Sequence, residues 1–202
     1  MKLYYKPGAC SLASHILLKE INADFEIESV NTGTGMTETG DDYTQINPKG
    51  YVPVLVLRKD MVITEGPAIL QYLADLAPKS EMLPPLGSES RAKVIEHLTY
   101  VSSELHKAFG PLFNPAIDET TKAQAKIVAS KKLEYFNQIF SDGRDYLVDN
   151  KVSIADLYLF VVSNWCNFVA ISLDETPHLS RFVSRIANRP SSLAAMTAEG
   201  LF

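Results

Sequence analysis

One proline-rich stretch separates two different patterns in this chain. Residues 77–90, APKSEMLPPLGSES, hold three prolines, one glycine and three serines, a composition typical of a linker. Short apolar runs and turn residues precede this stretch, whereas apolar residues at helical spacing follow it, with almost no strand signal. The chain is therefore predicted to form two domains, one over residues 1–80 and one over residues 88–202.

The first domain is predicted to be a small mixed sheet covered by helices. Its strands are expected at residues 2–5, 25–30, 54–57 and 61–63, and the last two form a hairpin that turns at residues 58–60. Its helices are expected at residues 11–21 and 65–76, while residues 31–40, NTGTGMTETG, are predicted to be a polar loop. The resulting order is βαβ followed by ββα, which suits one sheet with helices on its faces.

The second domain is predicted to be entirely helical. Helical spacing covers residues 90–109, 122–140, 153–171 and 177–187, and a final short helix is expected at residues 191–198. Ser153 and Asp156 have the S-x-x-D spacing of a capping box, which signals the start of a helix and carries no chemistry. Cys166 is predicted to be a packing residue on one of these helices.

The composition narrows the classes of partner. The chain has 202 residues and a net charge of -5, which argues against nucleic acid or an anionic membrane surface as a partner. It shows neither the apolar segment of a signal peptide nor a run long enough to span a bilayer. Its two cysteines cannot form a disulfide scaffold, and its cysteines and four histidines show no metal-ligand spacing. We therefore expect a soluble protein of the reducing cytoplasm, without a metal.

Cys10 stands at the joint between a predicted strand and a predicted helix. It follows a Pro-Gly-Ala turn, and the helical run begins directly after it. The free N–H groups and the dipole of a helix N-terminus favour negative charge, and a cysteine there can have its pKa lowered to roughly 3.5–7.5. The next three residues, Ser-Leu-Ala, hold no second thiol, so a resolving thiol would come from another molecule. A reactive thiol and a small packing residue are both open interpretations at this point.

Two further stretches are suited to binding a peptide-like ligand. Val52-Pro53 begins a strand, and a cis bond there would turn the backbone groups of Val52 away from the sheet, although only about 5% of X–Pro bonds are cis. Glu65 and Gly66 begin a helix, where a carboxylate suits an ammonium and the backbone amides suit a carboxylate. An amino-acid head group carries both charges, although an ordinary acidic first turn has the same sequence.

The helix at residues 90–109 carries a polar stripe. At about 100° per residue, Thr99, Ser103 and His106 fall on one face, nearly opposite the apolar residues. Such a stripe is usually solvated surface. His106 is a functional candidate only if this face is turned toward the first domain or its Cys10. The sequence GTGMTETG lacks the spacing of a dinucleotide-binding loop, and we find no Walker motif or nucleophile elbow.

Taken together, these stretches resemble the bacterial beta class of the glutathione S-transferases. The resemblance rests on YKPGACSLASHI, NPKGYVPVL, TEGPAILQYLAD, ELHKAF, SIADLYLF and the AEGL ending, which run along nearly the whole chain in family order. It implies a thioredoxin-like N-terminal domain, an all-α C-terminal domain and a homodimer. Glutathione and a small electrophile would be the substrates, the latter in an apolar pocket for which Tyr5, Phe109, Leu112 and Phe113 are candidates.

The resemblance also assigns roles to single residues. Cys10 matches the cysteine beside the glutathione sulfur, and Val52 matches the residue whose backbone pairs with the cysteinyl part of glutathione. Glu65 and Gly66 match the pair that holds the γ-glutamyl head group. Contacts from the first helix of the second domain, some of them from the neighbouring subunit, are implied for Ser103, Glu104 and His106.

Two positions depart from the family pattern. A basic residue that reaches the glycyl carboxylate of glutathione is replaced by Gly35, and residues 31–40 contain no lysine or arginine. The other position, usually asparagine, is Thr99. A charge-assisted hydrogen bond contributes roughly 1.5–3 kcal/mol, so we expect weaker glutathione binding than is typical of the class.

Three functions remain open on this evidence. The first is attack of the glutathione thiolate on an electrophile, with a neutral Cys10 donating its S–H because two adjacent thiolates repel each other. The second is thiol–disulfide exchange through a mixed disulfide of Cys10 with glutathione. His106 is expected to assist either route as a hydrogen-bond donor or as a cation. The third is a non-catalytic binding protein on the same scaffold.

Overall fold

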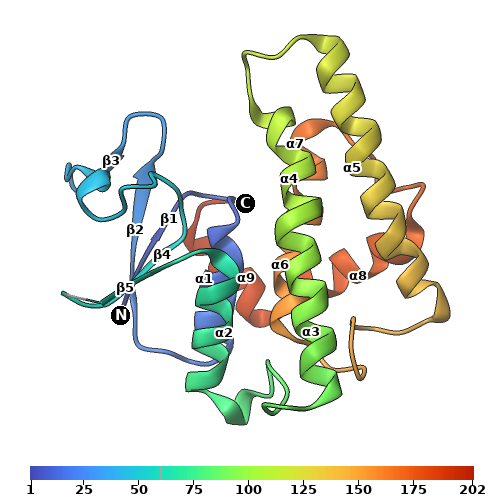
Figure 1. Ribbon diagram of the computed structural model, residues 1–202, viewed down its shortest axis with the longest axis horizontal. Helices are drawn as coiled ribbons and strands as arrows, with labels where there is room; N and C mark the ends of the chain where they lie inside the picture. The colour runs from blue at the N-terminus through green and yellow to red at the C-terminus, as the bar shows by residue number, and fades with distance from the viewer. Residues whose placement is uncertain (60) are drawn as a thin grey trace. The chain divides into compact units, whose positions relative to one another are not determined.

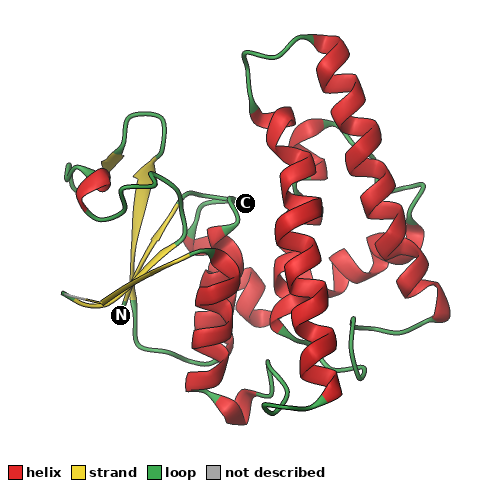
Figure 2. Ribbon diagram, in the orientation of Figure 1, coloured by secondary structure: helices red, strands yellow, loops and turns green. Residues whose placement is uncertain are grey.

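The chain divides into two compact units in the computed structural model, which describes residues 1–59 and 61–202. Unit 1 comprises Met1–Leu83 together with Arg189–Phe202, and unit 2 comprises Pro84–Asn188. Figures 1 and 2 show strands and helices in unit 1, and long helices in unit 2. The division falls within the predicted linker, whereas the last helix belongs to unit 1 and not to the helical domain predicted over residues 88–202.

Unit 1 contains a five-stranded sheet in the order β3-β2-β1-β4-β5. The strands are β1 (Lys2–Tyr5), β2 (Glu26–Asn31), β3 (Met36–Thr37), β4 (Val54–Arg58) and β5 (Met61–Thr64). β1 and β2 are parallel, whereas β4 is antiparallel to both β1 and β5. The predicted thioredoxin-like arrangement is confirmed, and the predicted hairpin turn includes residue 60, which lies outside the described residues.

β3 was missed because it lies within the segment predicted to be a loop. A two-residue strand is too short to show the alternation that identifies strands in a sequence. The side chain of Asn31 holds the turn between β2 and β3, since its Oδ1 accepts hydrogen bonds from the amides of Gly33 and Thr34 at 3.0 and 3.2 Å. The segment is therefore an ordered hairpin.

The helices of unit 1 are α1 (Ser11–Glu20), α2 (Gly66–Leu76) and α9 (Pro190–Ala198), with short 3-10 helices at Tyr43–Gln45 and Pro78–Ser80. α1 packs against both α2 and α9, and its residues from Ser11 to Leu18 are buried. Glu20 accepts hydrogen bonds from Arg189 and Ser191, which ties the start of α9 to the end of α1. These contacts explain why the last helix folds with the first domain.

Unit 2 is helical in the residues that the structure describes. Its helices are α3 (Glu89–Tyr100), a π-helical turn (Val101–Leu105), α4 (His106–Phe109), α5 (Glu119–Ile139), α6 (Ile154–Asn164), α7 (Cys166–Val169) and α8 (Pro177–Ala187), with 3-10 helices at Gly110–Phe113 and Phe140–Asp142. The helix predicted over residues 153–171 is interrupted at Trp165. α7 ends where Ala170 adopts a left-handed backbone conformation at φ 53°.

α6 is the central helix of unit 2, and every residue from Ile154 to Ser163 is buried. The predicted capping box at its start is present: Asp156 accepts hydrogen bonds from the amide and hydroxyl of Ser153 at 2.8 and 2.6 Å. Asp156 also accepts a 2.9 Å hydrogen bond from the amide of Leu147. One carboxylate therefore connects the start of α6 to the loop that precedes it.

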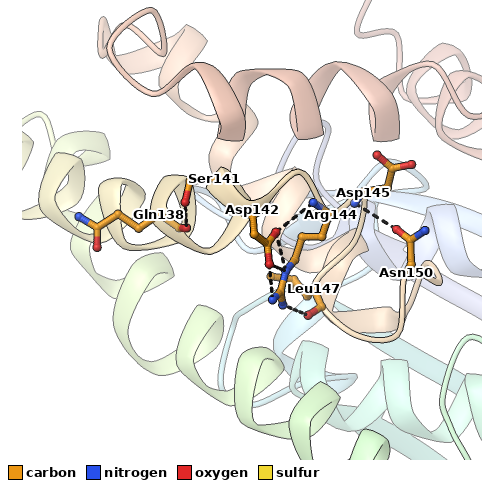
Figure 3. A network of polar contacts seen from close by, with 7 residues as sticks. All are labelled: Gln138, Ser141, Asp142, Arg144, Asp145, Leu147 and Asn150. Carbon is orange, nitrogen blue, oxygen red and sulfur yellow. Dashed lines mark hydrogen bonds and ion pairs between the residues drawn. The ribbon is translucent and has the colours of Figure 1, made fainter.

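That preceding loop is held by a second set of polar contacts (Figure 3). The guanidinium of Arg144 donates to both carboxylate oxygens of Asp142 and, at 3.2 Å, to the carbonyl of Leu147. The amide of Asp145 donates to Oδ1 of Asn150 at 3.2 Å. These bonds shape the turn from α5 toward α6.

Candidate functional site

The register of the sheet brings several predicted site residues to one end of unit 1. Tyr4 lies opposite Val54, and Val54 lies opposite Thr64. Beyond this row of residues, β1 runs into the turn before Cys10, and β5 runs into Glu65. β4 begins in the same row, so the Val52-Pro53 segment that leads into it also lies there. Strand pairing therefore gathers segments that are far apart in the sequence.

Cys10 contacts Val52 directly at this end of the sheet. The thiol donates a hydrogen bond to the Val52 carbonyl, with an Sγ–O distance of 3.4 Å, and the Val52–Pro53 bond is cis. Cys10 makes no side-chain capping bond to α1, because its own backbone is already helical at φ -58° and ψ -21°. A carbonyl oxygen accepts a hydrogen bond from the S–H form of the thiol, so this contact suits the neutral Cys10 of the first expected route.

The backbone carbonyl of Tyr51, next to Val52, is held by side chains from the segment before β4. The backbone oxygen of Tyr51 accepts hydrogen bonds from the hydroxyl of Tyr43 at 2.9 Å and from the amide group of Asn47 at 2.7 Å. Tyr43 is fully buried, and burial raises its pKa to about 12. This support orients the backbone at the start of β4.

Glu65 lies at the start of α2 in a left-handed conformation, with φ 68°. Its Oε1 accepts a 2.7 Å hydrogen bond from Nζ of Lys49, which also reaches the hydroxyl of Thr64 at 3.0 Å. Both charged side chains are exposed, so the pair contributes only about 0–1 kcal/mol to stability. Gly66 is buried as the first residue of α2. Lys49 is not among the predicted site residues, although it contacts Glu65 and stands in the quoted NPKG motif.

Gly35 lies in the turn between β2 and β3, with φ +71°. Its amide donates to the carbonyl of Asn31 at 2.8 Å, and its own carbonyl accepts from the amide of Tyr43 at 2.8 Å. Lys6 contacts this turn from outside it, since its Nζ lies 3.4 Å from the hydroxyl of Thr32. Gly35 therefore belongs to the same end of the sheet, without a charge of its own.

Glu199, at the end of α9, supports the turn that carries Cys10. Its Oε2 accepts a 3.0 Å hydrogen bond from the amide of Gly8, and its Oε1 lies 2.9 Å from Nδ1 of His15. The side chains of His15 and Glu199 are both fully buried. The role of Glu199 was not predicted, because its partners lie at the opposite end of the sequence.

In unit 2, Thr99 and Ser103 are exposed and line a cleft of about 790 Å³ on α3 and the π-helical turn. Glu104 is also exposed, and its Oε2 accepts a 2.6 Å hydrogen bond from Nζ of Lys132. The exposure of Thr99 and Ser103 agrees with the predicted polar stripe, to which Glu104 does not belong.

His106 departs from that stripe. Its Nδ1 lies 2.8 Å from the hydroxyl of Tyr158 on α6, and its ring meets that of Trp165 edge to face, with centroids 4.8 Å apart. The turn at Val101–Leu105 is π-helical, and its extra residue per turn rotates the following residues relative to the predicted α-helical phase. The predicted stripe assumed an uninterrupted α-helix, whereas His106 follows a π-helical turn and is only partly exposed.

Burial, together with the smaller effect of the charge of Lys107, lowers the pKa of His106 to about 4. The imidazole is therefore uncharged at neutral pH, which favours the hydrogen-bond donor over the cation among the two roles expected for His106. Phe109 and Phe113 also contact Trp165, with ring centroids at 5.8 and 5.5 Å. Two of the predicted apolar pocket residues thus belong to one aromatic cluster with His106, whereas Tyr5 is buried in unit 1.

In the described part of the chain, we find no group of three histidine, cysteine or carboxylate side chains placed to hold a metal ion. The same residues include no helix with the length and apolarity needed to cross a membrane.

Comparisons with known proteins agree with this architecture. A family model described as the N-terminal domain of glutathione S-transferases matches residues 1–75, and one described as the C-terminal domain matches residues 100–190. The chain is 46% identical over 201 residues to glutathione S-transferase GstA of Escherichia coli O157:H7, with 100% of both chains covered.

Solved structures give the same result. The beta-class glutathione S-transferase of Sphingomonas chungbukensis superposes with a TM-score of 0.96 at 41% identity, covering 100% of both chains. A sphingomonad glutathione S-transferase solved in complex with glutathione superposes with a TM-score of 0.95 at 42% identity, again covering 100% of both.

Proposed function

The chain belongs to the glutathione S-transferase family, and from this premise we propose that it conjugates glutathione to electrophilic substrates, with Cys10 beside the glutathione sulfur. The observation that carries the role of Cys10 is its S–H hydrogen bond to the Val52 carbonyl. An extended cysteinyl backbone paired with Val52 would take over that carbonyl. The S–H of Cys10 would then turn to the ligand sulfur, which it would stabilise as a thiolate.

The remaining parts of glutathione suit the other residues at this end of the sheet. We assign the γ-glutamyl ammonium to Glu65 and its carboxylate to the first amides of α2, including that of Gly66. Lys49 neutralises Glu65 in the structure, and the ligand ammonium would replace it there. The glycyl end lies toward Gly35, where no cation belongs to the turn itself.

For unit 2 we propose two contributions. The uncharged His106 acts in the transfer as a hydrogen-bond donor. The exposed side chains of Thr99, Ser103 and Glu104 contact glutathione in a homodimer, where some of these contacts come from the neighbouring subunit. We place the protein in the cytoplasm, because Cys10 and Cys166 form no disulfide, which suits a reducing compartment.

Binding and conjugation test this proposal together. We expect the protein to be retained on immobilised glutathione, to be eluted by free glutathione, and to conjugate glutathione to a chromogenic aryl halide. Retention without conjugation would favour a binding protein on the same scaffold. An absence of both, in a folded protein, would contradict the proposed function.

A lysine at position 35 is expected to tighten glutathione binding by about tenfold, since a charge-assisted hydrogen bond contributes about 1.5 kcal/mol or more. An added Cβ meets only Thr44, at 3.9 Å, so the side chain has space. The φ of +71° strains any residue with a Cβ, and Gly35→Ala therefore serves as the control with equal strain and no charge. Calorimetry should show tighter glutathione binding for Gly35→Lys than for Gly35→Ala. Equal affinities would refute the claim that the lack of a cation at position 35 weakens glutathione binding.

A further inference from the structure

The imidazole of His106 is held on one edge and left accessible on the other. Nδ1 lies 2.8 Å from the hydroxyl of Tyr158, which is 3% exposed on the central helix α6. Trp165, directly after α6, packs edge to face on the same ring. Nε2 has no hydrogen-bond partner among the described residues, and it is not among their fully buried unpaired atoms. Nε2 is therefore the nitrogen available to a ligand.

The neutral ring carries one proton for two nitrogens, so the bond at Nδ1 decides the state of Nε2. A phenol O–H is a stronger donor than a neutral imidazole N–H, and an imidazole nitrogen is a stronger acceptor than a phenol oxygen. The favoured arrangement has Tyr158 donating to Nδ1, which leaves the proton on Nε2. The reverse arrangement would make Nε2 an acceptor and a potential base.

We propose that Tyr158 is a positioning residue that holds His106 in the Nε2–H tautomer and makes it a hydrogen-bond donor to negative charge developing in the reaction. The acceptor is a thiolate sulfur or the leaving group of the electrophile, and this part of the inference rests on the proposed transferase function. The π-helical turn at Val101–Leu105 supports the assignment, because it directly precedes His106, which contacts Tyr158 of α6, and such turns are frequent at functional sites.

The tautomer can be read by NMR without any assay of activity. Long-range ¹H–¹⁵N spectra of histidine-labelled protein are recorded near neutral pH, with the His106 signals assigned through His106→Asn. We expect a protonated-type shift at Nε2 and an unprotonated-type shift at Nδ1, and we expect Tyr158→Phe to give averaged shifts of two tautomers. Tyr135→Phe makes the same chemical change on exposed α5 and should leave the His106 signals unchanged. An unprotonated Nε2 in the native protein, or unchanged shifts in Tyr158→Phe, would overturn the proposal.

Kinetics give a second readout. Tyr158→Phe should lower kcat for conjugation about tenfold, as for one lost transition-state hydrogen bond, and leave KM for glutathione unchanged. Adding Tyr158→Phe to His106→Asn should cause no further loss, because Tyr158 acts through His106. Full additivity of the two changes would contradict the inference. A protein without transferase activity would contradict the proposed function, while the NMR spectra would still decide the role of Tyr158.

Discussion

Replacing Cys10 with serine is expected to abolish glutathione-dependent disulfide reduction while conjugation to an aryl halide continues at a reduced rate. Exchange requires the Cys10 sulfur, which attacks a glutathione disulfide, forms the mixed disulfide and releases one glutathione thiolate. A serine hydroxyl cannot form this bond. It can donate a hydrogen bond to the glutathione sulfur, as the S–H does, so conjugation should fall by only about tenfold.

The two activities are measured on the same preparations, with a glutathionylated substrate for exchange and an aryl halide for conjugation. Cys166→Ala is the matched control, because Cys166 is 1% exposed and burial raises its pKa to about 12, which makes it an inert thiol. With oxidised glutathione, mass spectrometry should find a glutathione adduct on Cys10 in the native protein and none in Cys10→Ser.

The outcomes for Cys10→Ser separate the routes. If both activities survive unchanged, Cys10 has no role in either reaction. If a folded Cys10→Ser variant loses conjugation as completely as exchange, the sulfur itself is needed in both, and hydrogen-bond donation by Cys10 is refuted.

Replacing Asp156 with alanine is expected to lower the free energy of unfolding by about 3–5 kcal/mol, the cost of leaving several buried donors without an acceptor. Asp156 is completely buried and accepts from the amides of Ser153 and Leu147 at 2.8 and 2.9 Å. Its loss would remove the hydrogen bonds that hold the first turn of α6 and the loop before it. Urea unfolding measures the change, and Tm should fall by about 2–4 °C for each kcal/mol.

Asp118→Ala is the matched control for Asp156→Ala. Asp118 caps α5 with similar bonds, accepting from the amide and hydroxyl of Thr121 at 2.8 and 2.9 Å, but it lies on the surface. Its replacement should therefore cost much less stability than that of Asp156, because water can satisfy the freed donors. Equal losses in the free energy of unfolding of the two variants would show that the burial of Asp156 does not increase the contribution of its hydrogen bonds to stability.

Protonation of Asp156 is expected to make the stability of the protein depend on pH. Burial raises the pKa of Asp156 to about 6 from an ordinary value of 3.8, although its hydrogen bonds oppose the rise. The folded state therefore holds this proton more tightly than the unfolded state, so the contribution of Asp156 to stability falls as pH rises from about 4 to about 6. The stability difference between the native protein and Asp156→Asn should narrow over this range, and a constant difference would contradict the raised pKa.

The sequence alone was enough to predict features that depend on neighbours in the chain. The strand and helix periods predicted the main elements of both units, and the spacing of Ser153 and Asp156 predicted the capping box found at α6. β3 and the π-helical turn escaped prediction, because a two-residue strand and a single π-helical turn are both too short to show a period of their own.

The sequence by itself determined the order of the elements and placed Cys10, Val52, Glu65 and Gly66 at their ends, because capping, turn formation and periodicity are local interactions. Only the tertiary structure decided which of these ends meet. Strand register brings the Cys10 thiol to the carbonyl of Val52, 42 positions away, and helix packing brings Glu199 to Gly8, 191 positions away. Such contacts depend on pairing and burial across the whole unit, and no spacing along the chain encodes them.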